Sequence, residues 1–475
     1  MAGTGAKPPL GLLALNERLL LKLQQGERLT AHELVEIEPL RLKSREKQAP
    51  LAPPLAAALH RTLFEPPADQ GAVPVRCTYC GSDQVAPKSK QPRLKTVYDA
   101  DGDAHPTEVL RYYCHNPACA YRSFTHFPPG VLPHSAYPVQ VRLLALEVYV
   151  GLLSTYRRSA RVLGVKASTV YGWLVTLSPS ATALAAYLGV IRTSGVIGID
   201  DKWLKVCSPS AVPKHGRHPH AVWRYAYFAI DMFSYDLLAL EVYPEHNDAA
   251  VRQFLLELKA QGLQPRVVVS DLDPAYGRML PLIFPGAVHH ECIFHAIQNA
   301  QRQLTQVYGR HYVETVPAAA TLHAQIVELF HAQTQKTVRK RFAALLALRA
   351  AYVQQTPAVA CVFDSLETHF PKLVNAIESA LIPRTNNATE RIIRRLDQHY
   401  LTMCGLDSLE SARVYLHLFQ LVYRLTPLAD DNPGPKRGKC PLELAGYDLT
   451  ALPIADFFRD LQLPALAQSA KSLSQ

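Results

Sequence analysis

This chain lacks both long apolar runs and a regular cysteine framework. No apolar stretch reaches the roughly 18 residues that span a bilayer, and the amino terminus has no secretory signal pattern. The nine cysteines are odd in number and unevenly spread, unlike those of secreted disulfide-rich proteins. We therefore expect an intracellular protein with no membrane partner, in which cysteines serve metal ligation.

Charged residues are also scarce. They make up 19% of the 475 residues, against 48% hydrophobic residues, which excludes a disordered chain and predicts two to four packed domains. The formal net charge is +10, which favours a polyanion such as nucleic acid as a partner. Charge alone fits a mildly basic enzyme equally well.

The first 70 residues are predicted to form a helical N-terminal region, whose function the sequence does not indicate. Amphipathic patterning predicts one helix at 10–25 and a second that opens at Thr30 with the form of a capping box. Segments rich in proline, alanine and glycine at 48–54 and 65–74 mark linkers.

Two cysteine pairs define a second region, at 71–130. Short β-prone runs at 94–98 and 109–113 separate the pairs, as in a zinc ribbon, and four thiolates would close a structural tetrahedral site with no position left for water. The alternative is four buried free cysteines, but the paired spacing and Gly81 after the first pair favour zinc. The predicted ligands are Cys77, Cys80, Cys114 and Cys119.

A helix-turn-helix pattern occupies 131–185. A short helix is followed by a turn at Gly164 and Val165, and Ser168 is predicted to cap a second helix whose apolar face carries Val170, Trp173 and Leu174. Such a pair also occurs as plain scaffolding. If it binds DNA, the residues that face phosphates or base edges are Lys166, Ser168, Thr169 and Tyr171.

Three acidic residues lie far apart in the second half of the chain. β-prone runs at 196–206, 223–231 and 237–243, a helix at 248–261 and a strand at 266–270 follow the order of the ribonuclease H-like fold. In that fold the first and fourth strands are neighbours, which brings Asp200 and Asp271 together. Glu390, in the segment NNATER at 386–391, is the third acid.

Each acid has a simpler interpretation. Asp201 competes with Asp200, and either is acceptable as a solvated strand-end residue. Asp273 competes with Asp271, although it is better placed as the N-cap of a helix starting near residue 274. Glu390 fits the third position of a helix capped at residue 387.

A cluster of carboxylates would suit phosphoryl transfer. Two Mg²⁺ (or Mn²⁺) ions per site can activate a water or 3′-hydroxyl and stabilise the leaving oxygen, and carboxylate oxygens are the ligands these ions prefer. No side-chain nucleophile is needed.

Residues from about 194 to 425 resemble the Mutator-like branch of the DDE transposases of bacterial insertion elements. The resemblance rests on GIDDKW at 198–203, Ser270 with Asp271, CIFH at 292–295 and NNATER at 386–391. It implies that Asp200, Asp271 and Glu390 are the catalytic, metal-binding triad. It also implies double-stranded DNA partners (transposon ends and target), a homodimer or larger synaptic oligomer, and a cytoplasmic, nucleoid-associated protein. The family often has glutamate where this chain has Asp201.

The resemblance divides the rest of the chain. The catalytic domain covers 190–308 and 381–425, a helical insertion at 309–380 explains the 119 residues between Asp271 and Glu390, and a C-terminal tail follows at 426–475. The fold class is therefore multidomain α/β. Helices are predicted at 321–333, 337–354 and 365–379 within the insertion.

Side chains around the triad have open roles. Cys292 and His295 are three apart on a predicted helix, and we favour a supporting or structural role for them over ligation of a second zinc ion. Basic residues near the acids either line a DNA channel or form a solvated face. These are Arg391, Arg394, Arg395, Lys202 and Lys205.

The function favoured by these patterns is metal-dependent cleavage and transfer of DNA strands at transposon ends. A domesticated DNA-binding regulator with the same fold is the first rival, and the presence of all three acids argues against it. A structure-specific metal-dependent nuclease is the second, and it has no need of two upstream DNA-binding modules.

Overall fold

The computed structural model describes residues 75–99, 102–128, 130–207, 221–403, 405–428 and 436–449. The predicted N-terminal helices, both linkers and the last 25 residues lie outside this part of the chain. The described chain is mixed α/β and divides into two compact units. One comprises Met1–Leu188, Gln398–Cys404 and His417–Gln475, and the other Gly189–Asp397 and Gly405–Leu416.

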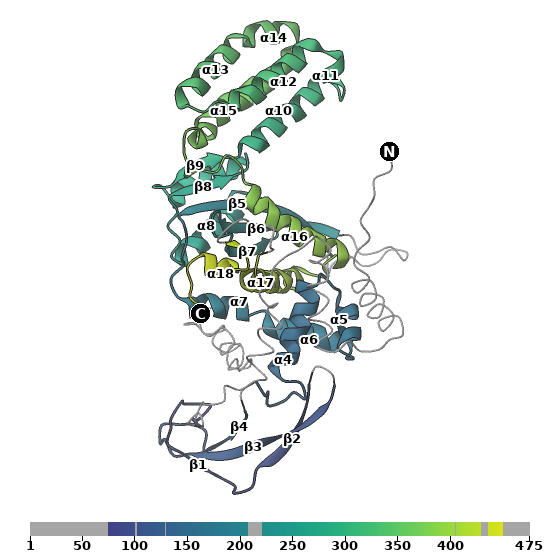
Figure 1. Ribbon diagram of the computed structural model, residues 1–475, viewed down its shortest axis with the longest axis vertical. Coiled ribbons are helices and arrows are strands. Elements are labelled where there is room, and N and C mark those ends of the chain that lie inside the picture. The colour runs from purple at the N-terminus through teal and green to yellow at the C-terminus, as the bar shows by residue number, and fades with distance from the viewer. Residues whose placement is uncertain are drawn as a thin grey trace. The chain divides into compact units, whose positions relative to one another are not determined.

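The first unit begins with a small antiparallel sheet (Figure 1). Its central strand is β3 (Ala104–Cys114), which pairs with β1 (Val85–Pro87), β2 (Arg93–Tyr98) and β4 (Ser123–His126). The strands predicted at 94–98 and 109–113 lie within β2 and β3, so that prediction is confirmed.

Helices follow the small sheet. They are α4 (Val139–Leu146), the π-helical turn η1 (Glu147–Gly151), α5 (Tyr156–Val162), α6 (Ala167–Leu177) and α7 (Ser180–Leu188), with the short α18 (Pro441–Leu444) near the carboxyl end. Gly164 has φ +62°, the left-handed conformation that glycine allows in the predicted turn. The predicted apolar face of α6 is buried.

The predicted cap of α6 is wrong by two residues. The helix begins at Ala167 with Lys166 at the N-cap position, and no side chain caps it. Ser168 is therefore an exposed residue of the first helical turn. The preceding helix, α5, does have a side-chain cap, because the Thr155 hydroxyl accepts a hydrogen bond from the Arg158 N–H at 3.3 Å.

The second unit contains a five-stranded sheet of order β7-β6-β5-β8-β9. β5 (Val196–Cys207), β6 (Ala221–Asp231) and β7 (Leu237–Tyr243) are antiparallel, whereas β8 (Val267–Ser270) and β9 (Val288–Glu291) continue the sheet in parallel. The four predicted strands are confirmed to within two residues at each end. β9 was missed.

Helices α8 (Asp248–Ala260) and α9 (Pro274–Ile283) pack against one face of this sheet. Their apolar residues share a core with alternate residues of β5, β6 and β8. Typical members are Ile197, Ile199, Tyr227, Phe254 and Val268.

On the opposite face lies the first part of α16 (Asn387–Met403). Lys202 of β5 donates to Asp397 of this helix, and Asn386 just before it donates to the Ile199 carbonyl. Both α16 and α17 (Leu409–Leu425) contribute residues to the two units.

A helical region separates β9 from α16 in the sequence (Figure 1). It contains α10 (Ile293–Tyr308), α11 (Tyr312–Thr315), α12 (Pro317–Phe330), α13 (Gln335–Ala347), α14 (Arg349–Gln355) and α15 (Ala360–Leu373). These helices share one apolar core that begins at Ile293. The helical character predicted for 309–380 is confirmed, but a break at Leu348 divides the predicted helix at 337–354 into two. No helix in the described ranges is both long and apolar enough to cross a membrane.

Candidate functional site

Strand register brings Asp200 and Asp271 together. In the parallel pair of β5 and β8, Gly198 lies opposite Val269, and each acid follows two residues later on its own segment. Because side chains alternate along a strand, both acids emerge on the face that α16 covers. The interpretation of Asp200 as a strand-end residue is wrong, since β5 continues beyond it to Cys207.

Asp201 completes a cluster of three aspartates. One carboxylate oxygen from each of Asp200, Asp201 and Asp271 lies within 4.8 Å of the others. Such a set of oxygen donors fits a hard divalent cation such as Mg²⁺ or Mn²⁺.

The electrostatics of the cluster agree with a cation site. Burial, followed by the charges of Asp271 and Asp201, raises the pKa of Asp200 well above its usual value. Burial also raises the pKa of Asp271, and it raises that of Asp201 to about 6 against the opposing effect of His246. Crowded, buried carboxylates disfavour their own ionisation, and a divalent cation would relieve this repulsion.

Glu390 lies one turn into α16, and its surroundings differ from the predicted cap. Asn386 occupies the N-cap position, because its carbonyl accepts the Glu390 N–H at 3.1 Å. The Glu390 Oε1 atom is buried and has no hydrogen-bond partner. The carboxylate therefore does not serve a capping box, and its negative charge adds to the factors that raise the pKa of Asp200.

Asn386 joins the third acid to the first. Its side-chain amide donates to the Ile199 carbonyl at 3.0 Å and to Asp200 Oδ2 at 3.2 Å, while its Oδ1 accepts from the Thr389 hydroxyl at 2.6 Å. All four residues are buried. Asn386 therefore fixes the start of α16 against β5, which sequence reasoning did not predict.

This close approach requires Gly198. A Cβ atom at that position would lie 2.8 Å from Asn386 Oδ1 and 2.5 Å from Met232 Sδ, and it would also collide with Thr389. We expect Gly198→Ala to destabilise the folded protein by about 1–3 kcal/mol, because the interior has no room to relax. Urea unfolding measures this, with Gly286→Ala as the matched control, since a Cβ there meets open space. Equal stability of the two variants would contradict the tight contact.

Cys292 and His295 also face Glu390. Cys292 was predicted to lie on the helix, but it is the N-cap residue just before α10. The Asn386 N–H donates a hydrogen bond to its sulfur at 3.3 Å. His295 Nε2 lies 3.7 Å from Glu390 Oε1. Ligand atoms of Cys292, His295 and Glu390 fall within 4.8 Å of one another, so the pair directly neighbours the third acid.

Asp273 has the role predicted for it. Its carboxylate caps α9 by accepting the Ala275 N–H at 2.6 Å. It also contacts His246 Nε2 at 2.5 Å, and His246 Nδ1 lies 3.9 Å from Asp201. His246 was missed because it stands in a loop between β7 and α8, with no motif around it.

Two of the basic residues near the acids, Lys202 and Arg391, have partners of their own. Lys202 Nζ forms an ion pair with Asp397 at 2.8 Å. Arg391 is exposed and places its guanidinium 5.7 Å from the centre of the Tyr235 ring. Arg394 is exposed and Arg395 half-buried, and DNA contact by any of these residues stays a prediction.

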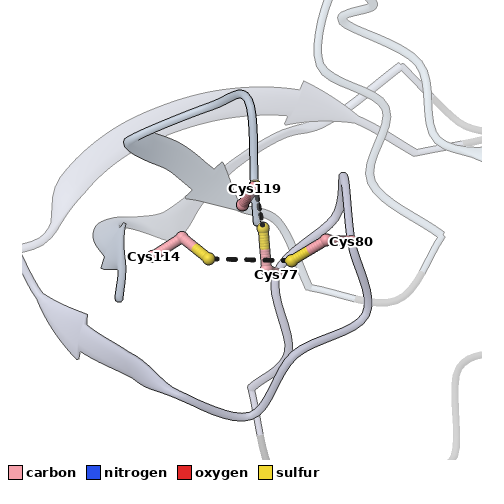
Figure 2. A group of neighbouring side chains, drawn as sticks. All are labelled: Cys77, Cys80, Cys114 and Cys119. Carbon is pink, nitrogen blue, oxygen red and sulfur yellow. Dashed lines mark hydrogen bonds between the residues drawn. The ribbon is translucent and has the colours of Figure 1, made fainter. Parts of the chain in front are cut away.

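The four predicted zinc ligands meet in the first unit (Figure 2). The sulfurs of Cys77 and Cys119 are 3.9 Å apart, and those of Cys80 and Cys114 are 3.7 Å apart. Zinc–sulfur bonds of about 2.3 Å set the edges of a regular tetrahedron at roughly 3.8 Å. The spacing therefore fits a tetrahedral zinc ion and is far too long for disulfides.

The residues predicted to meet DNA in the helix-turn-helix lie around the start of α6. Lys166, Ser168 and Tyr171 are exposed and Thr169 is half-buried. Tyr171 packs edge-to-face on Tyr156 of α5, with ring centres 5.4 Å apart. DNA contact by these four residues stays a prediction.

Comparison with known proteins gives one family. Residues 231–402 match the model of the Mutator-family transposases, a range that includes Asp271 and Glu390 and begins after Asp200. No curated protein matches the chain.

Solved structures give weaker likenesses. The Drosophila P element transposase strand transfer complex shares 8% identity, with 61% of this chain and 92% of that chain covered and a TM-score of 0.35. The Mos1 transposase paired-end complex with the left transposon end shares 14% identity, with 46% and 77% covered and a TM-score of 0.16. The Mos1 strand transfer complex shares 14% identity, with 28% and 52% covered and a TM-score of 0.13. Scores this low carry no argument, and the family assignment rests on the sequence match, which gives a Mutator-family transposase domain at residues 231–402.

Proposed function

We propose that this transposase binds the terminal inverted repeats of its element and cleaves and transfers DNA strands at a centre formed by Asp200, Asp271 and Glu390. One observation carries the proposal. Asp200 and Asp271, 71 residues apart in the sequence, converge with Asp201 beside one end of the parallel strands. Glu390, 119 residues beyond Asp271, is grouped with Cys292 and His295 instead, but its charge raises the pKa of Asp200, and its buried Oε1 has no hydrogen-bond partner.

The catalytic domain is proposed to be ribonuclease H-like, covering 190–308 and 381–425 with the helical insertion between. The strand order β7-β6-β5-β8-β9, with three antiparallel strands followed by two parallel ones, supports this assignment. The last helix of the insertion, α15, is attached to β9, because buried Glu291 contacts His369 at 2.6 Å and Lys372 at 2.8 Å. The chain therefore returns to the sheet before it reaches Glu390.

Divalent ions, Mg²⁺ or Mn²⁺ in pairs, would supply charge stabilisation for the attacking and leaving oxygens of a phosphodiester. The protein contributes a rigid setting. Asn386 holds one oxygen of Asp200, the Asp201 N–H donates to the other at 2.9 Å, and the Asp273 N–H donates to Asp271 Oδ1 at 3.0 Å. These bonds orient the carboxylates before DNA arrives, which reduces the reorganisation needed during the reaction.

DNA recognition is assigned to the upstream modules, a zinc ribbon at 71–130 and a helix-turn-helix at 131–185. The proposed contacts are Lys166, Ser168, Thr169 and Tyr171, with Arg391, Arg394, Arg395 and Lys202 closer to the acids. Holding two element ends together also requires a homodimer or larger assembly. A regulator that retains the fold would have no reason to keep all three acids.

A nicking assay tests the proposal. The full-length protein is incubated with labelled duplex that carries the inverted repeats flanking its own gene, with and without Mg²⁺. We expect Mg²⁺-dependent nicks at the repeat ends with the wild type and none with Asp271→Ala. If the wild type nicks no better than the variant while both bind the repeats, the protein acts as a regulator instead.

A further inference from the structure

Three aromatic side chains form a row on the strand pair that continues past the acids. In the register of β5 and β6, Asp201 lies opposite Tyr227, Trp203 opposite Tyr225 and Lys205 opposite Trp223. Because side chains two residues apart share a face, the row of Trp203, Trp223 and Tyr225 lies on the same face as Asp201.

This aromatic row is open to solvent. Trp203 is 52% exposed and Trp223 46% exposed, whereas Leu204 and Val206 on the opposite face of β5 are buried. Both indole rings therefore leave about half of their surface in contact with solvent in the isolated chain. An exposed group of this kind, next to a reactive centre, indicates a binding surface.

The rings are arranged edge-to-face. Trp203 and Trp223 have ring centres 5.9 Å apart at 64°, and Trp203 and Tyr225 have centres 5.7 Å apart at 78°. In an edge-to-face pair the ring that contributes its edge keeps both faces free, whereas two stacked rings each lose one face, so π-surface remains for a flat ligand. Lys205 Nζ lies 5.0 Å from the centre of the Trp223 ring and places a positive charge at the outer end of the row.

The inner end of the row reaches the acidic cluster. Tyr225 and His246 have ring centres 5.2 Å apart, and His246 contacts Asp273 and lies 3.9 Å from Asp201. Trp203 is two residues beyond Asp201 on the same face, which corresponds to roughly 7 Å along a strand. An Asp201 carboxylate oxygen lies within 4.8 Å of those of Asp200 and Asp271, so the row begins beside the cluster. A DNA strand with one phosphate at the acids would therefore have its next few bases within reach of the indoles.

We propose that Trp203, Trp223 and Tyr225 form a stacking platform for unpaired bases of the DNA strand adjoining the cleaved phosphate, an inference that rests on the proposed function. Every nucleobase has a flat face that stacks on aromatic rings, and a nearby cation contacts the backbone. Bases within a duplex are already stacked, so the platform selects a single-stranded or unpaired segment. The net charge of +10 and Lys205 favour nucleic acid over an apolar peptide on this surface.

Oligonucleotide binding tests this platform without any cleavage. The probe is oligothymidylate of about ten nucleotides, the size range of single-strand sites, added to the full-length protein without divalent metal. The chain has three tryptophans, and Trp173 is buried in α6, so stacking on the platform is expected to quench most of the tryptophan fluorescence. An abasic oligonucleotide of equal length and charge is expected to give no quenching.

Variants identify the residues that stack. Anisotropy of the labelled oligonucleotide should show roughly ten- to hundredfold weaker binding for Trp203→Ala, near-wild-type binding for Trp203→Phe, and no change for Phe233→Ala. Phe233 is the matched control, since it is 43% exposed in the turn at the other end of β6.

The outcomes separate this inference from the proposed function. Asp271→Ala should bind oligothymidylate like the wild type. A protein that fails to nick its own transposon ends can therefore still support the stacking platform. Equal binding of the abasic oligonucleotide, or unchanged affinity of Trp203→Ala, would overturn the platform even if the triad cleaves DNA. Quenching by duplex DNA as strong as that by the single strand would also overturn it.

Discussion

Asp200→Asn is expected to lower the rate of strand nicking by about 10³-fold or more. Charge stabilisation by bound metal is worth several kcal/mol, and an amide cannot supply an anionic ligand. The same variant is expected to be more stable to urea when no metal is present. The folded protein raises the pKa of Asp200 through burial and neighbouring charge, so the ionised carboxylate disfavours folding at neutral pH and its removal helps.

Asp201→Asn is the matched comparison. Asp201 follows Asp200 directly but lies on the other face of β5, with His246 3.9 Å away. We expect a loss of nicking at least tenfold smaller than that of Asp200→Asn, since the proposed ligands are Asp200, Asp271 and Glu390, and Asp201, although its oxygen belongs to the cluster, also faces His246. An equal or larger loss for Asp201→Asn would assign the catalytic role to Asp201.

Cys114→Ser is expected to remove zinc from the protein and unfold the small sheet. Structural zinc sites supply folding energy directly, with apparent binding energies of about 10–16 kcal/mol, and a three-thiolate site with serine loses most of this. Metal analysis should fall from about one zinc per chain to near zero, limited proteolysis should cut between β1 and β4, and affinity for the inverted repeats should fall.

Cys361→Ser controls for the loss of a thiol. Cys361 is an exposed free cysteine on α15, remote in sequence from the four ligands, and its variant should retain zinc and protease resistance. Full zinc content in Cys114→Ser would show that the four cysteines do not form the site.

Much of the fold could be predicted because its local signals are strong. β5 to β8 carry apolar runs bounded by turns, and α8 has an apolar stripe with Asn247 as its cap. β9 could not, because its sequence VHHE is polar. Its last two residues are buried only because distant residues satisfy them, with His290 Nδ1 at 3.0 Å from the Lys372 carbonyl and Glu291 paired to α15.

The candidate site was predicted in part for a similar reason. Motifs identified Asp200, Asp271 and Glu390, but the setting of each depends on residues remote in sequence. Asn386 donates a hydrogen bond to Asp200, which is 186 residues earlier in the sequence. Asn386 is also the N-cap residue of α16 in place of the predicted residue 387, so Glu390 does not take the predicted position in a capping box. Ser168 was misplaced as a cap because helix boundaries depend on backbone geometry that propensity defines only to a few residues.

Manganese binding followed by electron paramagnetic resonance tests the convergence of the three acids most directly. The zinc-loaded full-length protein is titrated with Mn²⁺, beside single variants Asp200→Asn, Asp271→Asn and Glu390→Gln and the control Asp397→Asn, whose carboxylate instead pairs with Lys202. The account predicts that the wild type and Asp397→Asn bind Mn²⁺ alike and that each triad variant binds at least about tenfold more weakly. Wild-type binding by all three triad variants would contradict a shared metal centre.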